Sequence, residues 1–416
     1  MKNTLIISFD LIRTGEVEKP LAIASILTYL KSDKRLQEAA AFHHISINIL
    51  NYGGRATSLD FDNRLAIFDL EKFDFIAISA YVWNEYLINP FIQHLRNLGY
   101  RNKIVLGGYQ ISYSDTRKLP AKYPDCQVFI TGYAEQSFKQ LYSLNSTEFP
   151  VFLNAPVDFT ELPSSYLNNE IEVAYDSQMV RLETKRGCPY RCSFCAHRDL
   201  TKNKMHKHPL EKVFQEISFL TERRVKRINI LDPIFNTGKE HIEVMREINR
   251  VNATSKFTLQ TRFELIKGET GKQFLELCSN GNYHLEFGLQ TSNISEATNI
   301  NRQNKNQIID EVFEEIKDRN ISYEVSLIYG LPGQTLDSFQ RSIEYVQKKG
   351  CTSVKAYPLM LLRGTELFHQ KGNWNLKEEE IGDFNIPVVT SSSTFSKNDW
   401  WQMHGIAEQL METGRI

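Results

Sequence analysis

The chain has 416 residues, of which 41% are hydrophobic and 24% charged, and its formal net charge at pH 7 is −1. This composition is that of an ordinary globular protein of about two domains, and the near-neutral charge argues against nucleic acid or a membrane surface as the main partner. No window reaches the ~20 apolar residues of a membrane span. The apolar run in MKNTLIISFD is too short for a secretory signal, so we expect a strand there and a cytoplasmic protein.

Short apolar runs alternate with amphipathic stretches over residues 1–149, the first predicted domain. We expect strands at 5–9, 45–50, 75–80, 104–106 and 128–130, and helices at 21–30, at 90–98 and up to residue 141. This alternation predicts a doubly wound parallel α/β sheet, whose ligands bind beyond the carboxyl ends of the strands. Gly107 and Gly108 follow one of these strands, where they permit either close approach of a ligand or an ordinary tight turn.

Residues 150–178 lack clear periodicity and are rich in proline, which predicts a linker. The alternation resumes in the second predicted domain, residues 179–370, with strands at 180–182, 228–231, 257–259, 284–289, 323–328 and 354–359. Six strands joined by helices are too few for a closed eight-stranded barrel, so we expect an open, partial barrel with its chemistry at the carboxyl ends of the strands. Residues 371–416 are expected to form a cap that ends in a helix over 398–411.

Three of the six cysteines, Cys188, Cys192 and Cys195, lie at C-x3-C-x2-C spacing just after the first strand of this barrel. Thiolates are preferred ligands of iron–sulfur clusters and of zinc, and three of them leave one iron of a four-iron cluster open to a substrate or cofactor. A structural zinc site needs four protein ligands. The alternatives are therefore a zinc site completed by His197, or three free buried thiols. An iron–sulfur site, with no disulfide framework, also favours a reducing interior.

The loop, with Phe194 before its last cysteine, resembles the cluster-binding signature of the radical S-adenosylmethionine (SAM) superfamily. The resemblance implies that the three cysteines hold a [4Fe–4S] cluster whose open iron is chelated by SAM, with Phe194 at the cofactor. Reductive cleavage of SAM would then give a 5′-deoxyadenosyl radical. The resemblance also implies a TIM-like (β/α)6 barrel and an electron donor such as flavodoxin or ferredoxin.

Residues at the other strand ends resemble the SAM contacts of the superfamily. The resemblance assigns Asp232 to the SAM amino group, Arg262 to its carboxylate, Glu286 and Gln290 to its methionine or ribose part, and Gly330 to its adenosine.

Each of these residues also has a structural alternative. Asp232 can belong to a prolyl turn, Arg262 can form a surface ion pair with Glu264, and Glu286 can form a hydrogen-bonded pair with Gln290. The burial of an unpaired carboxylate is costly, which favours a functional role for Glu286.

Four runs in the first domain, EKPLAIA, SAYVWN, LGG and TGYAE, occur in an order that resembles the cobalamin-binding domain of B12-dependent radical SAM enzymes. This resemblance implies cobalamin contacts by Pro20, Trp83, Gly107 and Gly108. The chain has no Asp-x-His-x-x-Gly motif to supply a histidine ligand to cobalt. Trp83 is therefore the candidate neighbour of the lower cobalt face, with a core indole as the alternative.

The leading hypothesis is cobalamin-dependent methylation of an unactivated carbon in a small molecule or peptide. One alternative is a radical SAM epimerase, cyclase or rearranging enzyme whose first domain delivers no methyl group. An epimerase would need a hydrogen donor, for which Cys278 and Cys351 are candidates, although each is otherwise a core thiol. The alternative from another class is an iron–sulfur redox sensor that binds a partner.

Overall fold

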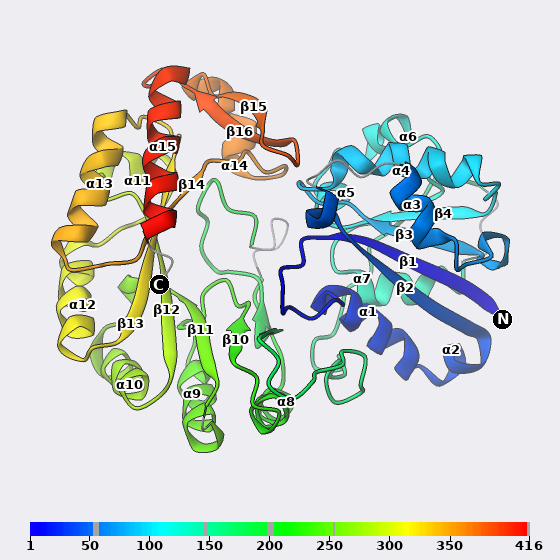
Figure 1. Ribbon diagram of the computed structural model, residues 1–416, viewed down its shortest axis with the longest axis horizontal. Coiled ribbons are helices and arrows are strands. Elements are labelled where there is room, and N and C mark those ends of the chain that lie inside the picture. The colour runs from blue at the N-terminus through cyan, green and yellow to red at the C-terminus, as the bar shows by residue number, and fades with distance from the viewer. Residues whose placement is uncertain (53–57, 145–147, 198–203, 253, 414–416) are drawn as a thin grey trace. The chain divides into compact units, whose positions relative to one another are not determined.

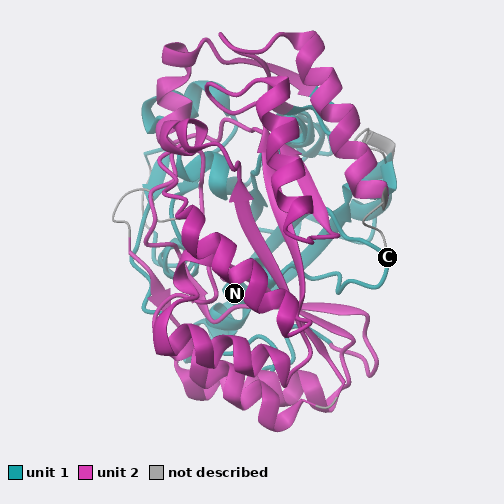
Figure 2. Ribbon diagram, turned by 90° about the vertical axis from the view of Figure 1, so that its left-hand side faces the viewer, with its two compact units in different colours: residues 1–172, 381–386 teal, residues 173–380, 387–416 magenta. Residues whose placement is uncertain are grey.

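The computed structural model describes residues 1–52, 58–144, 148–197, 204–252 and 254–413. Contacts divide the chain into two compact units, residues 1–172 with 381–386 and residues 173–380 with 387–416 (Figure 2). Among the described residues, no helix combines the length and the apolar character needed to span a membrane.

The first unit is built on a six-stranded parallel sheet with the order β2-β1-β3-β4-β5-β6 (Figure 1). The strands are β1 (Lys2–Asp10), β2 (Ala40–Asn48), β3 (Phe75–Ser79), β4 (Lys103–Gly107), β5 (Val128–Ile130) and β6 (Val151–Leu153). Since β2 lies on one side of β1 and the later strands lie on the other, the winding reverses between β1 and β3. Sheets of this kind bind ligands outside the carboxyl ends of the strands at that point.

The side chains of each strand alternate between two apolar cores, one on each face of the sheet. In β1, Leu5 and Ile7 belong to the core that α3 (Ser58–Leu65) and α4 (Glu85–Asn97) cover. Ile6 points the other way, into the core that α1 (Leu21–Ser32), α2 (Lys34–Ala39) and α7 (Ala134–Leu141) cover. Two short helices, α5 (Tyr109–Ser112) and α6 (Leu119–Lys122), complete the unit. This two-fold alternation buries both faces of the sheet and confirms the predicted doubly wound fold.

Two elements of this unit differ from the sequence prediction. Helix α4 begins at Glu85 and contains Pro90, where the sequence had suggested its start. Leu87 and Ile88 are buried by this longer helix, which offsets the hydrogen-bond donor that Pro90 lacks. Residues 151–153, at the start of the predicted linker, form β6 because they pair in parallel with β5.

The second unit is built on six parallel strands in chain order, with β7 and β14 at the two edges (Figure 1). They are β7 (Met179–Leu182), β10 (Arg227–Ile230), β11 (Lys256–Thr261), β12 (Tyr283–Gln290), β13 (Ser322–Tyr329) and β14 (Val354–Pro358). The intervening helices are α8 (Leu210–Glu222), α9 (Glu240–Val251), α10 (Gly268–Ser279), α11 (Ile294–Asn299), α12 (Asn306–Asp318) and α13 (Leu336–Lys348). Because β7 and β14 do not pair, the sheet is an open, partial barrel, as predicted.

The elements after β14 contain more regular structure than the sequence indicated. They are α14 (Glu366–Gln370), the paired strands β15 (Lys377–Ile381) and β16 (Ile386–Ser391), and α15 (Lys397–Thr413), which was predicted as a helix over 398–411. A second small pair, β8 (Lys185–Arg186) and β9 (His206–Lys207), is antiparallel and lies next to the cysteine loop in the chain. The alternating signal of a two-residue strand is too short to be recognised in a sequence.

Candidate active site

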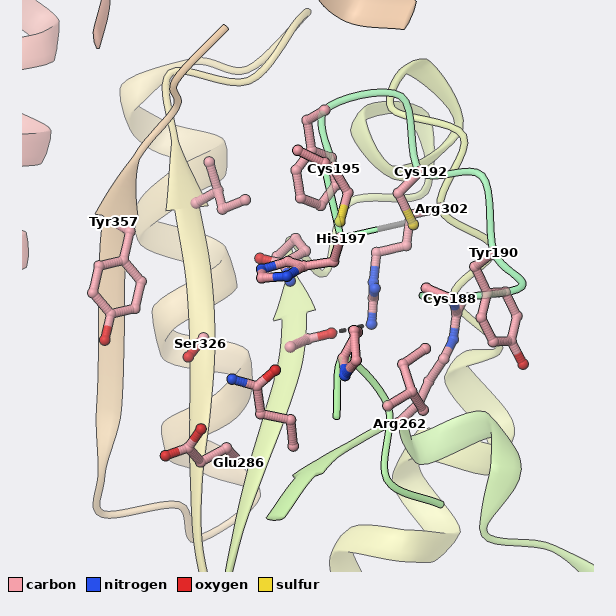
Figure 3. A pocket seen from close by; sticks show the side chains of 18 of the residues that line it. Cys188, Tyr190, Cys192, Cys195, His197, Arg262, Glu286, Arg302, Ser326 and Tyr357 are labelled. Carbon is pink, nitrogen blue, oxygen red and sulfur yellow. Dashed lines mark hydrogen bonds between the residues drawn. The ribbon is translucent and has the colours of Figure 1, made fainter. Parts of the chain in front are cut away.

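A cavity of about 380 Å³ lies in the second unit, where the cysteine loop meets the carboxyl halves of the barrel strands (Figure 3). This volume is within the range of small-molecule sites. The cavity is lined by all three loop cysteines and by Phe194, Arg262, Glu286 and Gln290, which the sequence had assigned to one site. The barrel therefore brings together residues that are about one hundred positions apart in the chain.

Strand β12 shows how the sequence places polar groups in this cavity. Leu285 and Phe287 are fully buried on one side of the strand, whereas Glu286, Gly288 and Gln290 line the cavity on the other. The alternation follows from the two-residue period of a strand. At Gly288 an added Cβ would stand 2.5 Å from Nε2 of Gln290, so the absence of a side chain there leaves room for the amide.

The cysteine loop is anchored to the barrel at its start. Gly187 has φ +86°, and an added Cβ would stand 2.5 Å from the Lys204 carbonyl oxygen, so the turn into the loop requires glycine. Farther along, the Ser193 amide donates to the Ile300 carbonyl at 2.9 Å, and the Ser193 carbonyl accepts from the Leu367 amide at 2.8 Å. These bonds connect the loop to the segment after α11 and to α14 itself.

Asp232 lies outside the cavity lining, so its placement does not support the predicted contact with SAM. Its side chain is fully buried, and its oxygens accept hydrogen bonds from the Thr184 amide at 2.8 Å, from the Lys185 amide at 3.1 Å and from the Thr184 hydroxyl. The Lys185 ammonium is 3.9 Å from the carboxylate and donates to two carbonyl groups, those of Phe235 and Thr237. Asp232 therefore holds the backbone that leads into the cysteine loop.

Arg262 lines the cavity, but its charge is already neutralised. Its Nε donates to Glu264 at 2.9 Å, its Nη2 donates to the Gln303 carbonyl at 3.2 Å, and its guanidinium lies 4.0 Å from the centre of the Tyr190 ring. Both Arg262 and Glu264 are buried. The ion pair that the sequence analysis gave as the alternative for Arg262 is therefore present, but inside the barrel rather than on the surface.

Arg302 is a cavity residue that the sequence analysis missed. It follows α11 in the chain and is only 8% exposed. Its guanidinium donates a hydrogen bond to the Gly288 carbonyl. An isolated arginine in the asparagine-rich run NINRQN has no periodic signal, so nothing in the sequence marks it as buried.

Glu286 is the acidic group of the cavity. Burial raises the pKa of its carboxyl, and the charge of Glu324, its neighbour across β12 and β13, adds to the increase. Glu324 is itself held by Lys355 at 2.6 Å and by His284 at 3.3 Å. The Lys355 ammonium and the His284 ring are thus bonded to Glu324, which leaves the Glu286 carboxyl available to a group in the cavity.

The remaining predicted residues lie elsewhere. Gly330 has φ +88° and donates its amide to Gln334 at 2.7 Å, but it does not line the cavity. Cys278 and Cys351 are buried outside the lining, and burial raises the pKa of the Cys351 thiol to about 11. These two thiols therefore have the environment of core residues.

The four cobalamin candidates belong to the first unit. Gly107 ends β4, and Pro20 precedes α1. Gly108 has φ +93°, and an added Cβ would stand 2.7 Å from the Ala80 carbonyl oxygen. The Trp83 indole follows β3, stacks on Tyr81 at 4.6 Å and donates to the Phe9 carbonyl at 3.2 Å. Trp83, Gly107 and Gly108 thus follow the carboxyl ends of neighbouring strands, where ligands of such sheets bind.

The donor set at the cavity fits an iron–sulfur cluster. Burial raises the pKa of the Cys195 thiol to about 12 and also raises that of Cys188, and the neighbouring sulfurs add to both shifts. A coordinated metal removes this penalty because it deprotonates its thiol ligands. Among the described residues, no three His, Cys, Asp or Glu side chains converge on one point suitable for a single ion. A zinc ion needs its sulfur ligands at about 2.3 Å, whereas the ligands of a four-iron cluster bind different iron atoms.

Comparisons with known proteins agree with this geometry. A family model described as "Radical SAM superfamily" matches residues 182–346. The cobalamin-dependent radical SAM methyltransferase TokK of Streptomyces tokunonensis is 23% identical over 403 residues, which cover 88% of this chain and 56% of TokK. The chain thus spans little more than half of that relative. The ribosomal protein uS12 methylthiotransferase RimO of a Synechococcus strain is 22% identical, over 84% of this chain and 78% of RimO.

Two solved structures share the fold over nearly the whole chain. The radical SAM methyltransferase TsrM from Kitasatospora setae, solved with tryptophan and a SAM analogue, has a TM-score of 0.69 at 13% identity, covering 99% of this chain and 89% of TsrM. OxsB, a cobalamin-dependent radical enzyme solved with aqua-cobalamin and SAM, has a TM-score of 0.70 at 13% identity, covering 99% of this chain and 67% of OxsB. The resemblance drawn from the cysteine loop is therefore confirmed. Residues 182–346 match the radical SAM superfamily, in a chain whose relatives and structural neighbours include cobalamin-dependent radical SAM enzymes.

Proposed function

We propose that the protein is a radical SAM enzyme in which Cys188, Cys192 and Cys195 hold a [4Fe–4S] cluster beside the barrel cavity. The observation that carries the proposal is the convergence of three cysteines, a guanidinium and an available carboxyl on one cavity of small-molecule size. When bound there, the cluster and SAM supply one-electron chemistry, the reductive cleavage of SAM, with the electron coming from a flavodoxin or ferredoxin.

The residues of the cavity match the polar groups of SAM. The guanidinium groups of Arg262 and Arg302 can donate to its carboxylate, since guanidinium and carboxylate form strong charge-assisted hydrogen bonds. Glu286 and Gln290 lie on β12 and can accept from its ribose hydroxyls or amino group. Aromatic Phe194 and the apolar segment that ends β14 complete the wall and exclude water from the reacting groups.

We further propose that the reaction is a cobalamin-dependent methylation of an unactivated carbon in a small molecule or peptide. Support comes from the first unit, whose sheet has its switch point between β1 and β3, and from the matches to TokK and TsrM, which are described as methyltransferases. Cobalamin would be held at the ends of β3 and β4 by Trp83, Gly107 and Gly108. The SAM contacts assigned to Asp232 and Gly330 are not retained, because neither residue lines the cavity.

The test is anaerobic reconstitution with iron, sulfide, SAM, hydroxocobalamin and a low-potential reductant, followed by mass spectrometry. Wild type should form 5′-deoxyadenosine, and Cys195→Ala should lose it together with the absorbance of the cluster. The matched control is Cys278→Ala, which removes a buried thiol outside the cavity and should leave product formation unchanged.

The products separate the competing functions. S-adenosylhomocysteine together with bound corrinoid supports methyl transfer, whereas 5′-deoxyadenosine without bound corrinoid supports a rearranging enzyme. Absence of 5′-deoxyadenosine from protein with a complete cluster contradicts the proposal and favours a redox sensor.

A further inference from the structure

Arg302 is a buried cation without a counter-charge of its own. It is 8% exposed, and no carboxylate lies within ion-pair distance of it among the residues that the structure describes. Arg262, on the same cavity and 3% exposed, differs because it is paired with Glu264 at 2.9 Å. An unpaired charge inside a protein costs several kcal/mol unless another group compensates it. The cavity must therefore supply an anionic partner for Arg302.

Arg302 lies beside the cysteine loop, which points to an anionic group held by that loop as the partner. The Ser193 amide donates to the Ile300 carbonyl at 2.9 Å, and Nδ2 of Asn301 donates to the Arg191 carbonyl at 2.8 Å. These two bonds join the segment that carries Arg302 to the cysteine loop on both sides of Cys192. Figure 3 shows the Arg302 side chain beside Cys192 and the cavity.

The surroundings of the Arg302 guanidinium also point to an anionic group at the cysteine loop. One nitrogen donates to the Gly288 carbonyl, and the side chain lies beside Cys192 (Figure 3). The Nε atom is buried and has no partner. Burial, followed by the charge of Arg262, lowers the pKa of Arg302, while the Cys192 sulfur acts in the opposite direction. Arg302 thus has one donor on the Gly288 carbonyl, and its Nε is free for a group in the cavity.

We propose that Arg302 tunes the redox potential of the cluster, because its buried charge beside Cys192 (Figure 3), which no carboxylate of the described residues pairs, stabilises the reduced form. The inference rests on the proposed function, since it requires the three cysteines to hold a cluster. A cluster bound by three thiolates gains one negative charge when it accepts an electron, and a fixed cation beside one of those sulfurs favours that state. Hydrogen bonds to the sulfurs and nearby charge are established determinants of iron–sulfur potentials. The electron comes from the external reductant, and no bond in the protein is made or broken.

The experiment is a dithionite titration of the anaerobically reconstituted protein, followed by electron paramagnetic resonance and performed without SAM. Arg302→Met should lower the midpoint potential by about 59 mV or more, the equivalent of a tenfold loss in the equilibrium constant for a one-electron reduction. Arg302→Lys keeps the charge but not the planar fork of donors, so its potential should lie between those of Arg302→Met and wild type.

The control is Arg250→Met, which removes an exposed arginine that is paired with Glu247 at 2.6 Å and lies outside the cavity lining. Its midpoint potential should remain that of wild type. A wild-type potential in Arg302→Met with a complete cluster would overturn the inference and leave Arg302 as a ligand of SAM alone. If Arg302→Met does not assemble the cluster, the midpoint potentials of Arg302→Gln and Arg302→Lys are compared instead, because these two variants also differ in the charge at position 302.

Iron and sulfide analysis separates failure of this inference from failure of the proposed function. Wild-type protein that takes up no cluster contradicts the proposed function itself. A complete cluster whose potential is insensitive to Arg302 contradicts only the redox role.

Discussion

At the scale of single residues, the second unit uses buried charges for two different purposes. Asp232 is fully buried and accepts hydrogen bonds from the Thr184 and Lys185 amides, so its charge is satisfied by the backbone that precedes the cysteine loop. The carboxyl of Glu286 is left available, because Lys355 and His284 are bonded to Glu324. The first arrangement supports the loop, whereas the second leaves a polar group for a ligand.

Asp232→Asn should destabilise the second unit by about 3 kcal/mol, because it leaves the buried Lys185 ammonium without its charged neighbour. Urea unfolding followed by circular dichroism measures the loss. The control is Asp176→Asn, which removes exposed ion pairs to Arg224 and Lys226 and should cost at most ~1 kcal/mol. Equal losses in the two variants would contradict the structural role of Asp232.

At the scale of elements, hydrogen bonds of Ala80 join the carboxyl ends of β3 and β4. The Ala80 amide donates to the Gly107 carbonyl at 2.8 Å, and the Ala80 carbonyl accepts from the Gln110 amide at 3.0 Å. Gly108 lies between these bonds, with no room for a Cβ. The close packing of the backbone defines the surface on which we propose that cobalamin binds.

Gly108→Ala should be more destabilising than Gly99→Ala, although both glycines have φ +93°. At Gly99 nothing lies within 4 Å of an added Cβ, so only the left-handed conformation costs energy, roughly 1–2 kcal/mol. At Gly108 the new Cβ also collides with Ala80. Urea midpoints measure both losses, and corrinoid absorbance after gel filtration should fall only for Gly108→Ala. Similar midpoints for the two variants would show that the backbone near Ala80 relaxes freely.

Helices α2 and α7 are connected by a carboxylate whose effect on stability depends on pH. Asp33 caps α2 by accepting from the Arg35 amide, and it lies 2.5 Å from the Lys139 ammonium on α7. The hydrogen bond from Lys139, with that from Arg35, lowers the pKa of Asp33 to about 2. Since the pKa in the unfolded chain is about 3.9, ionised Asp33 stabilises the fold above about pH 4, and this contribution is lost as the pH falls toward 2.

Asp33→Asn keeps a capping oxygen but removes the charge. Its free energy of unfolding should be lower than that of wild type at pH 5, and the difference should shrink as the pH falls toward 2. Unfolding by urea at a series of pH values measures this difference. A difference that does not change with pH would exclude ionisation of Asp33 as its cause.

At the scale of the whole molecule, the proposed cofactor sites are divided between the two compact units. The cysteines and the cavity residues belong to the second unit, whereas Trp83, Gly107 and Gly108 belong to the first. Each unit has a complete sheet of its own. On the proposed function, we therefore expect cobalamin binding not to require an intact cluster site.

The triple variant Cys188→Ala/Cys192→Ala/Cys195→Ala should lose iron and SAM cleavage but still bind hydroxocobalamin. Absorbance spectra after gel filtration measure both cofactors in one sample. Trp83→Ala is the reciprocal variant, and it should retain the iron content of wild type while losing corrinoid. Loss of corrinoid from the triple variant would contradict separate sites.

The sequence alone determined the features that depend on local spacing. The interval between the cysteines indicated a loop able to hold a cluster, and the apolar neighbours of Glu286 indicated a carboxyl within a buried strand, because both patterns are short-range. Strand–helix alternation likewise predicted both sheets, and the count of six strands in the second domain predicted an open barrel.

Only the tertiary structure decided which charged groups reach the cavity. Arg302 belongs to an irregular segment, and hydrogen bonds to the cysteine loop, far away in the chain, bring it beside Cys192. Asp232 follows a barrel strand as predicted, yet it points to the backbone of Thr184 and away from the cavity. Such contacts join residues more than forty positions apart, and no local pattern encodes them, because the orientation of a side chain after a strand depends on the neighbours with which it packs.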